Sequence, residues 1–336
     1  MNMTNSDDKV LIVYHREDND GVYSAALIYR YLEEKMHVRK ENIDTLGADY
    51  NMLALMKKSI GEWKEKYTMV VMTDISFNDW RCMAKMKKVF GKKFIWIDHH
   101  APAIAQSVQH GYDDVDGMRE TWTSAIGLAY EWLWDPLRVN LSSSSSPRLL
   151  QYLAGWDSFN PNAYGLTSNE CMEVNLAVNM DTKLSLARAL QNVRDIMYGD
   201  GTESDQGRAF IDELIEEGHT ILEYQKAQWA TLVRENAEDG WTVNGRSAVA
   251  LFCQGASTSI MFESVKENVE CAIVFKHAKN GKWSISVYNT NREDDKVFHV
   301  GNYLKKVFKV AGGHAGAGGA TMSQSAFLRI LREKKL

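Results

Sequence analysis

Cysteine is scarce in this chain. Only 4 of the 336 residues are cysteines, and they stand far apart as Cys82, Cys171, Cys253 and Cys271. Because no two of them form a C-x-x-C pair, the sequence excludes a disulfide scaffold and a zinc site built from thiolates. We expect buried free thiols, which are typical of a protein of the reducing cytoplasm.

Positive charge is also in short supply. The chain has 39 lysines and arginines against 44 aspartates and glutamates, which gives a formal net charge of −5. A protein that wraps long duplex nucleic acid needs a broad basic face. The charge balance therefore favours a short anionic substrate over a long polymer.

Long apolar runs are absent. No run approaches the length of a membrane span, and the N-terminal stretch MNMTNSDDK has no apolar signal core. We therefore expect a soluble, cytoplasmic protein without a membrane partner. The sequence leaves open whether this protein is a monomer or a homodimer.

Strands and helices alternate in the first part of the chain. A hydrophobic content of 45% permits a real core, and 336 residues suit two domains. The patterns predict a strand over 9–14, a helix over 22–36, a strand over 68–74, a helix over 78–90 and a strand over 94–97. This alternation predicts an α/β fold with a parallel sheet.

The pattern changes further along the chain. Helices are predicted over 121–136, 147–156 and 169–197, followed by a long amphipathic helix over 204–236. Strand-like runs then appear at 247–253, 269–276 and 282–289, with a helix over 299–309 and a basic helical tail. We expect an N-terminal domain with the parallel sheet over 1–200, a connector helix over 201–239, and a smaller α/β domain with a mixed sheet over 240–336.

Polar residues stand where the predicted strands of the first domain end. The carboxyl ends of parallel strands share one edge of the sheet, where open sheets place their ligand sites. After the first strand, the stretch YHREDNDG supplies His15, Asp18 and Asp20. These residues would suit a hard cation, and the alternative is an acidic turn with a helix N-cap. Taken alone, the cap is the better interpretation.

The stretch FIWIDHHAPA is a stronger signal, because an aspartate and two adjacent histidines at a strand end are rarely structural. Adjacent side chains on an extended chain point in opposite directions. His99 and His100 are therefore poorly placed to ligate one metal ion together. One of them would bind metal and the other would face the substrate. Asp98 would orient one of the imidazoles without binding metal itself.

Asp74 follows the second predicted strand, and Asp157 follows a predicted helix where it would also serve as an ordinary cap. With these two, the candidate ligands are His15, Asp18, Asp20, Asp74, His99 and Asp157. Imidazoles and carboxylates without thiolate suit Mn²⁺ or Mg²⁺. Six donors are enough for two ions that share a carboxylate, and two ions about 3.5–4 Å apart are the standard device for hydrolysing a phosphate ester.

The glycine-rich stretch AGGHAGAGGA covers 311–320. It lacks the Lys-Ser/Thr of a Walker loop and does not fit the dinucleotide-binding fingerprint. Glycines let backbone N–H groups approach an anion closely, so His314 and the glycines before it are candidates for binding phosphate. The alternative is a flexible turn or a tight packing site for a helix.

The chain resembles the DHH phosphoesterase superfamily in the order of its motifs. These are H-x-x-D-x-D-G, an aspartate at a strand end, D-H-H, a late aspartate and G-G-H. The resemblance covers nearly the whole chain and is to the two-domain form with a DHH-associated C-terminal domain. Members of this superfamily include RecJ-type exonucleases, oligoribonucleases of the nanoRNase type, cyclic-dinucleotide phosphodiesterases and manganese pyrophosphatases.

The resemblance implies a role for each motif. One metal ion would be held by His15, Asp18 and Asp74, and a second by Asp20, Asp74, His99 and Asp157, with Asp74 bridging. The catalytic residues would be His100, on the scissile phosphate, and Asp98. Phosphate would be bound from the second domain by Gly312, Gly313 and His314. The chain departs from the common pattern by one residue in the spacing between the first histidine and the first aspartate, and by an alanine, Ala311, before the two glycines.

The resemblance and the acidic charge together predict a phosphodiesterase that hydrolyses short single-stranded oligonucleotides or dinucleotides to mononucleotides. It would use two divalent ions, with Mn²⁺ favoured over Mg²⁺. One alternative is a phosphatase for a small phosphorylated nucleotide or a pyrophosphate-like substrate. The other is a nucleotide-binding sensor without turnover, which a full set of ligands disfavours.

Overall fold

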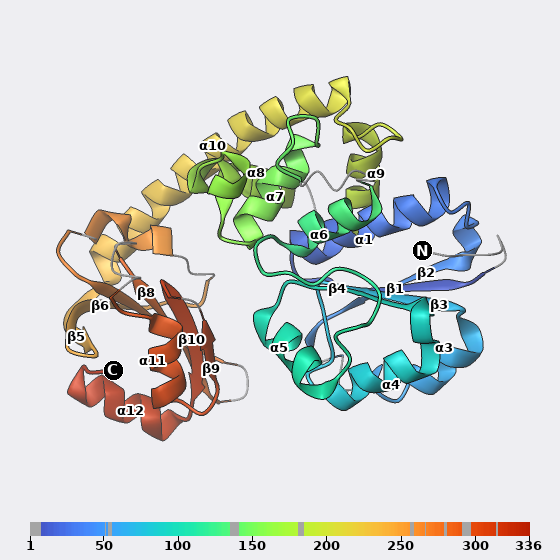
Figure 1. Cartoon of the computed structure of the whole chain (residues 1–336). Coiled ribbons are helices and arrows are strands. Elements are labelled where there is room, and N and C mark those ends of the chain that lie inside the picture. The colour runs from blue at the N-terminus through green and yellow to red at the C-terminus, as the bar shows by residue number, and fades with distance from the viewer. Residues whose placement is uncertain are drawn as a thin grey trace. The chain divides into compact units, whose positions relative to one another are not determined.

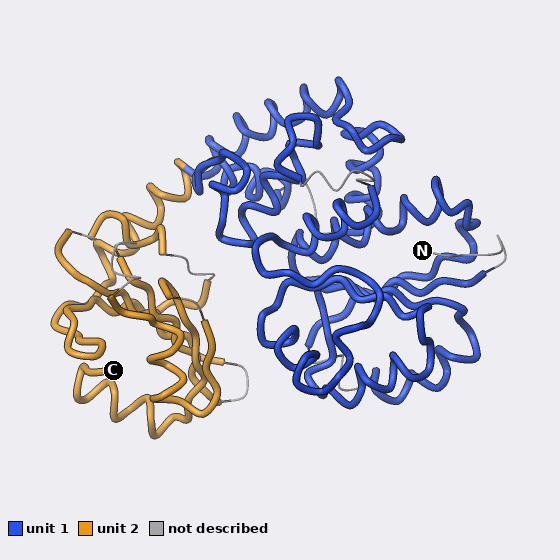
Figure 2. Tube along the Cα trace, viewed as in Figure 1, with its two compact units in different colours: residues 1–222 blue, residues 223–336 orange. Residues whose placement is uncertain are grey.

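The computed structural model describes residues 8–50, 52, 56–134, 141–180, 185–255, 259–265, 267–278, 281–290, 297–313 and 315–336. The chain divides into two compact units, residues 1–222 and 223–336 (Figure 2). Among the described residues, none of the helices combines the length and the apolar character that crossing a membrane requires.

The first unit is built on a four-stranded parallel sheet in the order β2-β1-β3-β4. Its strands are β1 (Val10–His15), β2 (Ile43–Ala48), β3 (Met69–Thr73) and β4 (Phe94–Ile97). Its helices are α1 (Asn19–Glu34), α3 (Ile60–Lys66), α4 (Trp80–Phe90), α5 (Ala101–His110), α6 (Ala125–Leu133), α7 (Arg148–Asp157), α8 (Ser168–Met180) and α9 (Leu186–Ile196). The parallel sheet predicted from the alternating pattern is confirmed.

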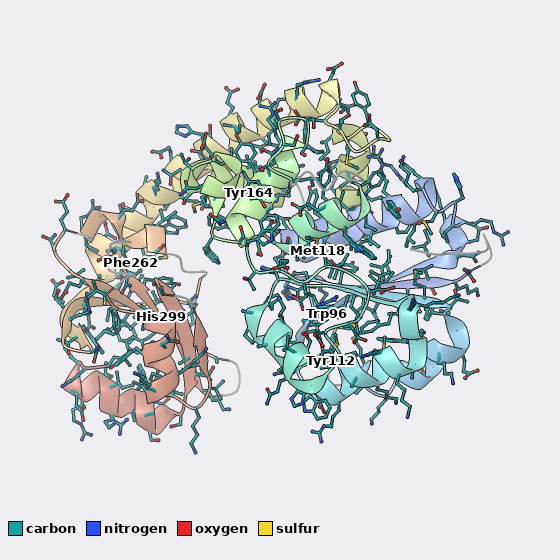
Figure 3. The ribbon with its side chains drawn as sticks, viewed as in Figure 1. Trp96, Tyr112, Met118, Tyr164, Phe262 and His299 are labelled. Carbon is teal, nitrogen blue, oxygen red and sulfur yellow. The ribbon has the colours of Figure 1, made fainter. Side chains whose placement is uncertain are left out.

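The strands β1, β3 and β4 are buried on both faces, as their continuous apolar runs predict. Val10 and Ile12 point into one core, and Leu11 and Val13 point into the other. Figure 1 shows α1 and α6 on the first face and α3, α4 and α5 on the second. Trp96, labelled in Figure 3, lies fully buried in the second core.

The second unit contains a six-stranded mixed sheet in the order β5-β6-β7-β8-β10-β9, in which β6 and β7 are parallel. Its strands are β5 (Glu238–Val243), β6 (Arg246–Phe252), β7 (Cys271–His277), β8 (Trp283–Asn289), β9 (Ala311–Gly313) and β10 (Ala317–Met322). Its helices are α11 (Val300–Val307) and α12 (Gln324–Glu333). Short 3₁₀ segments lie at Lys40–Asn42, Gly91–Lys93, Pro161–Tyr164 and Ser259–Val265. The predicted mixed sheet is confirmed.

One long helix, α10 (Asp205–Asn236), runs from the first unit into the second. Ile211 and Leu214, near its start, belong to the core of the first unit, and Val233 belongs to a core of the second. The sequence places a connector over 201–239, and the compact units divide inside this helix, between residues 222 and 223.

Several of the described elements differ from the sequence-based expectation. Over 169–197, where helix is predicted, the described residues form the helices α8 and α9. The strands β2 and β5 and the helices α3 and α5 were not predicted. The glycine-rich stretch, predicted to bind phosphate or else to be a flexible turn or a tight packing site for a helix, supplies the paired strands β9 and β10. Glycines at positions 312, 313, 318 and 319 therefore belong to a sheet.

Candidate metal centre

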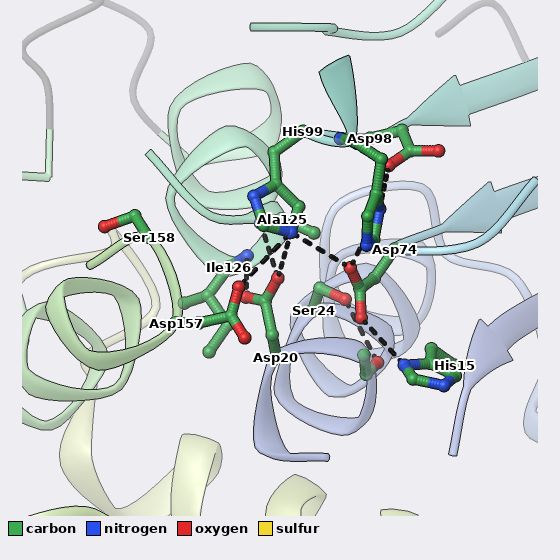
Figure 4. A network of polar contacts seen from close by, with 12 residues as sticks. His15, Asp20, Ser24, Asp74, Asp98, His99, Ala125, Ile126, Asp157 and Ser158 are labelled. Carbon is green, nitrogen blue, oxygen red and sulfur yellow. Dashed lines mark hydrogen bonds and ion pairs between the residues drawn. The ribbon is translucent and has the colours of Figure 1, made fainter. Parts of the chain in front are cut away.

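The candidate ligands of the first unit gather at the carboxyl edge of its parallel sheet. His15 ends β1, Asp74 follows β3, and His99 follows β4, while helices contribute the rest (Figure 4). Asp18 caps the N-terminus of α1, Asp20 lies in its first turn, and Asp157 is the last residue of α7. Position 21, in the first turn of α1, requires glycine because this turn packs against the end of β1. A Cβ at Gly21 would lie 2.0 Å from the backbone oxygen of His15.

His15 faces two carboxylates. Its Nδ1 atom lies 2.8 Å from Asp18 Oδ2 and 3.5 Å from Asp74 Oδ2. Hydrogen bonds to Asp18 and Asp74 raise the pKa of His15 to about 10. Burial alone would raise the pKa of Asp18, but the bond and charge of His15 outweigh it, and the pKa falls below its ordinary value. The short spacing between His15 and Asp18 therefore does not keep them apart.

His99 faces three carboxylates on the other side of Asp74. Its Nε2 atom lies 3.6 Å from Asp20 Oδ2, 3.4 Å from Asp74 Oδ1 and 3.2 Å from Asp157 Oδ2. Burial, followed by repulsion from Asp20 and Asp74, raises the pKa of Asp157 well above its ordinary value. Burying several carboxylates together is costly unless a cation or a proton compensates their charge.

Asp74 is the carboxylate that the two groups share, one oxygen facing His15 and the other facing His99. It is almost fully buried and has a φ of +56°, which is unusual for a residue with a side chain. Its backbone N–H donates to the Ile97 carbonyl oxygen at 3.0 Å. Burial and then the charge of Asp20 raise the pKa of Asp74 well above its ordinary value. Strain of this kind gathers at functional sites.

Asp20 is held by the start of α6. Its Oδ2 accepts a hydrogen bond from the Ala125 N–H at 2.8 Å, and its Oδ1 accepts one from the Ile126 N–H at 2.8 Å. These donors belong to the positive end of a helix dipole, which favours a carboxylate. The two bonds fix the plane of the carboxyl group and therefore the direction in which Asp20 faces His99.

Asp98 and His100 form a separate pair behind the ligands. Asp98 is fully buried and its Oδ1 lies 2.7 Å from His100 Nδ1, while its Oδ2 accepts a bond from Trp96 Nε1 at 3.0 Å. Burial lowers the pKa of His100, but the bond to Asp98 outweighs it, and the pKa is raised. The His100 side chain is 39% exposed against 15% for His99, so a substrate can reach it.

Sequence reasoning missed two parts of this site. The Tyr50 ring lies 5.5 Å from the His15 ring between centroids, and burial and then the charges of Asp98 and Asp74 raise its pKa. Tyr50 comes just after β2, which the sequence did not reveal. The second part is the backbone N–H groups of Ala125 and Ile126, which hold Asp20. Every residue except proline has such a group, so the sequence does not mark these two as functional.

The donors present fit a divalent metal. Three groups have ligand atoms within 4.8 Å of one another: His15, Asp18 and Asp74; Asp20, His99 and Asp157; and Asp74, His99 and His100. Carboxylate oxygens with imidazole nitrogens suit Mn²⁺ and Mg²⁺ better than softer ions. The repulsion that raises the pKa of Asp74 and Asp157 is what a bound cation would relieve.

Manganese binding should release protons and therefore tighten as the pH rises. Below its pKa of about 10, His15 carries a proton on the ring when no metal is bound, and a metal ion needs that nitrogen free. We expect the dissociation constant to fall by about tenfold per pH unit between about pH 6 and pH 8 for each proton released. Calorimetric titration with MnCl₂ in two buffers of different ionisation enthalpy measures this release. The His15→Ala variant should bind manganese more weakly, and its affinity should depend less on pH. A wild-type affinity for manganese that does not change between about pH 6 and pH 8 would contradict the expectation.

In the second unit, the glycine motif lies on the sheet edge. Gly312 belongs to β9, and Gly313 has a φ of +141° that a side chain would strain. A hollow of about 360 Å³ is lined by Ser284, Ile285, Ser286, Val310, Ala311, Gly312, Gly319, Ala320 and Thr321. His314, the other candidate for binding phosphate, lies outside the described residues.

In the first unit, Asp98, His99 and His100 follow β4 at the carboxyl edge of the parallel sheet. Residues 9–154 match the DHH family, N-terminal domain. This match covers the part of the chain that contains the parallel sheet, and the chain as a whole divides into two compact units.

Solved structures agree on the fold. A DHH domain described as a member of the s1p family of ribosomal proteins is 14% identical with a TM-score of 0.62, over 97% of this chain and 85% of that one. RecJ from Thermus thermophilus in complex with Mn²⁺ is 15% identical with a TM-score of 0.50, over 98% of this chain and 51% of that one. This chain therefore spans about half of that RecJ.

The pGpG-specific phosphodiesterase PggH from Vibrio cholerae is 11% identical, with a TM-score of 0.48 over 97% of each chain. Among curated protein sequences, none matches this chain.

Proposed function

We propose that this protein is a manganese-dependent phosphodiesterase that hydrolyses short oligonucleotides or dinucleotides to mononucleotides. One observation carries the proposal: Asp74 faces His15 with one carboxylate oxygen and His99 with the other. His15 and His99 each belong to a group of side chains whose ligand atoms lie within 4.8 Å of one another. His15, Asp18 and Asp74 would hold one ion, and Asp20, Asp74, His99 and Asp157 a second. Two such ions, when bound, lower the pKa of a water molecule and neutralise charge on a phosphate.

The remaining residues bind and orient. The buried carboxylate of Asp98 holds the His100 ring through Nδ1, which leaves Nε2 as the nitrogen that would meet a phosphate oxygen or donate a proton to it. The raised pKa of His100 favours the protonated ring, which suits contact with an anion. In the second unit, Gly312, Gly313 and His314 would bind phosphate. The net charge of −5 favours a short substrate over a long polymer.

The direct test incubates the protein with Mn²⁺ and a panel of substrates, and then identifies the products. The panel contains dinucleotides, short RNA and DNA, cyclic dinucleotides and pyrophosphate. Mononucleotides from the dinucleotides support the proposal. Release of inorganic phosphate alone would support a phosphatase, and tight nucleotide binding without any product would support a sensor.

Strands of a few nucleotides should be hydrolysed faster than long single strands, with mild base preference. Backbone N–H groups and an imidazole bind phosphate charge and do not distinguish bases. His314→Ala should therefore raise KM for a dinucleotide by far more than for a simple aryl phosphodiester that needs only the metal centre. His277→Ala is the matched control, because His277 is an exposed histidine of the same unit that contacts the Trp283 ring. Equal losses on both substrates would show that His314 acts structurally.

A further inference from the structure

Two exposed aromatic side chains belong to segments that shape the metal centre. Phe159 is 70% exposed and comes two residues after Asp157. Trp122 is 38% exposed and comes three residues before Ala125, whose N–H holds Asp20. Two residues of extended chain span at most about 7 Å. The Phe159 backbone is therefore within that distance of a candidate ligand (Figure 4 shows Asp157 and Ser158 at this helix end).

The backbone of Phe159 is in an unfavourable conformation for its side chain. Its φ is +53°, in the left-handed region. It follows the cap residue Ser158 of α7, and its N–H donates to the Trp156 carbonyl oxygen at 3.3 Å. Helices that end this way usually have glycine at this position, because a Cβ is strained there. Phe159 is therefore an aromatic residue that is both strained in its backbone and largely exposed.

The segments that carry the two rings are fixed to each other. The Asn160 side-chain amide donates to the Trp122 carbonyl oxygen at 3.4 Å. The next residue along, Thr123, shares a hydrogen bond between hydroxyl groups with Tyr164, and both side chains are buried. A single exposed aromatic residue on a protein surface needs no explanation. Here two exposed rings belong to segments that a hydrogen bond joins and that also carry Asp157 and the amide bonded to Asp20.

We propose that Phe159 and Trp122 form a stacking surface for a nucleobase of the substrate whose phosphate lies at the metal centre. This inference rests on the proposed function and adds that recognition requires an aromatic base, not only a phosphodiester. Every base has a π-face, so stacking adds affinity without selecting a base. The strain at Phe159 is then retained because it presents the ring to the substrate.

Phe159→Gly separates this role from a structural one. Glycine relieves the positive φ, so we expect the melting temperature to rise by about 2–4 °C. We expect KM for a ribodinucleotide to rise by about tenfold, as usual for loss of one stacked base, with metal binding unchanged. For a dinucleotide analogue that lacks the stacked base, KM should be the same in the variant and the wild type. Trp122→Ala should show the same dependence on the base.

His37→Gly is the matched control. His37 is also an exposed ring at positive φ, +54°, just beyond the C-terminal end of α1, about 24 Å of helix away from Asp18 and Asp20. It should gain stability without any change in KM. Abasic analogues with either sugar lacking its base show which base stacks.

Three outcomes decide the matter. An unchanged KM in Phe159→Gly, or an equal rise on the abasic analogues, would overturn the stacking surface while leaving the phosphodiesterase in place. A wild-type protein that hydrolyses no nucleotide ester at all would overturn the proposed function itself. A rise in KM that disappears when one base is removed supports the inference.

Discussion

Replacing Asp74 by asparagine should reduce phosphodiester hydrolysis by at least about three orders of magnitude, because it removes the one carboxylate shared by both ligand groups. The fold should survive. Asparagine has the same shape and tolerates the left-handed backbone that Asp74 adopts at φ +56°. Removing a buried charge from among Asp18 and Asp20 should even raise the melting temperature of the metal-free protein. Turnover, thermal unfolding and bound manganese are the three measurements.

Asp79→Asn is the matched control for this variant. Asp79 lies five residues further along, caps α4, and pairs with Lys57 and Arg81 at 3.3 and 3.0 Å. Asparagine is an equally good cap, so this variant should keep its activity. If Asp74→Asn keeps wild-type turnover, the shared carboxylate is not part of the reaction and the two-metal account fails.

His100→Ala should lower kcat by about two to four orders of magnitude, the usual range for a positioned acid or electrostatic group. Metal stoichiometry should stay unchanged, because the His100 ring is bonded to Asp98 whereas His99 faces three ligand carboxylates. Asp98→Asn should give a smaller loss, since it weakens the orientation of the His100 ring without removing it.

The control for this pair is His110→Ala. His110 ends the same helix α5 that His100 caps, and its ring stacks on Trp80 instead of facing the ligands. Its removal should leave kcat unaffected. Loss of one manganese equivalent in His100→Ala would show that His100 is a metal ligand. Its Nδ1 atom lies 3.8 Å from Asp74 Oδ1, which is close enough for the two side chains to share an ion.

The sequence was most informative where hydrophobic pattern and chemistry coincide. The run 94–97 is entirely apolar and buried, and the strand β4 has the predicted bounds. Because parallel strands share one edge, the amino-acid pattern alone places the polar residues after β1, β3 and β4 together. Where local pattern is weak, prediction failed. In β2, IDTLGA, only the first and last residues are buried, as fits an edge strand. In α5, Pro102 stands near the start of the helix, where proline is favourable.

The details that make the site work depend on contacts between distant residues. Asp20 and the amides that hold it are separated by 105 positions in the chain. The positive φ of Asp74 follows from how β3 ends against β4, and the composition of TMVVMTD does not indicate it. The stretch AGGHAGAGGA reads as a loop because glycine is rare in strands, yet neighbouring strands supply the pairing that makes β9 and β10.

Anomalous diffraction at the manganese edge, from crystals grown with MnCl₂, tests the central claim most directly. The account predicts two separate manganese peaks in the first unit, each in contact with a different carboxylate oxygen of Asp74. One ion should also contact His15 and Asp18, and the other should contact Asp20, His99 and Asp157. A single peak, or two peaks of which neither contacts Asp74, would contradict it.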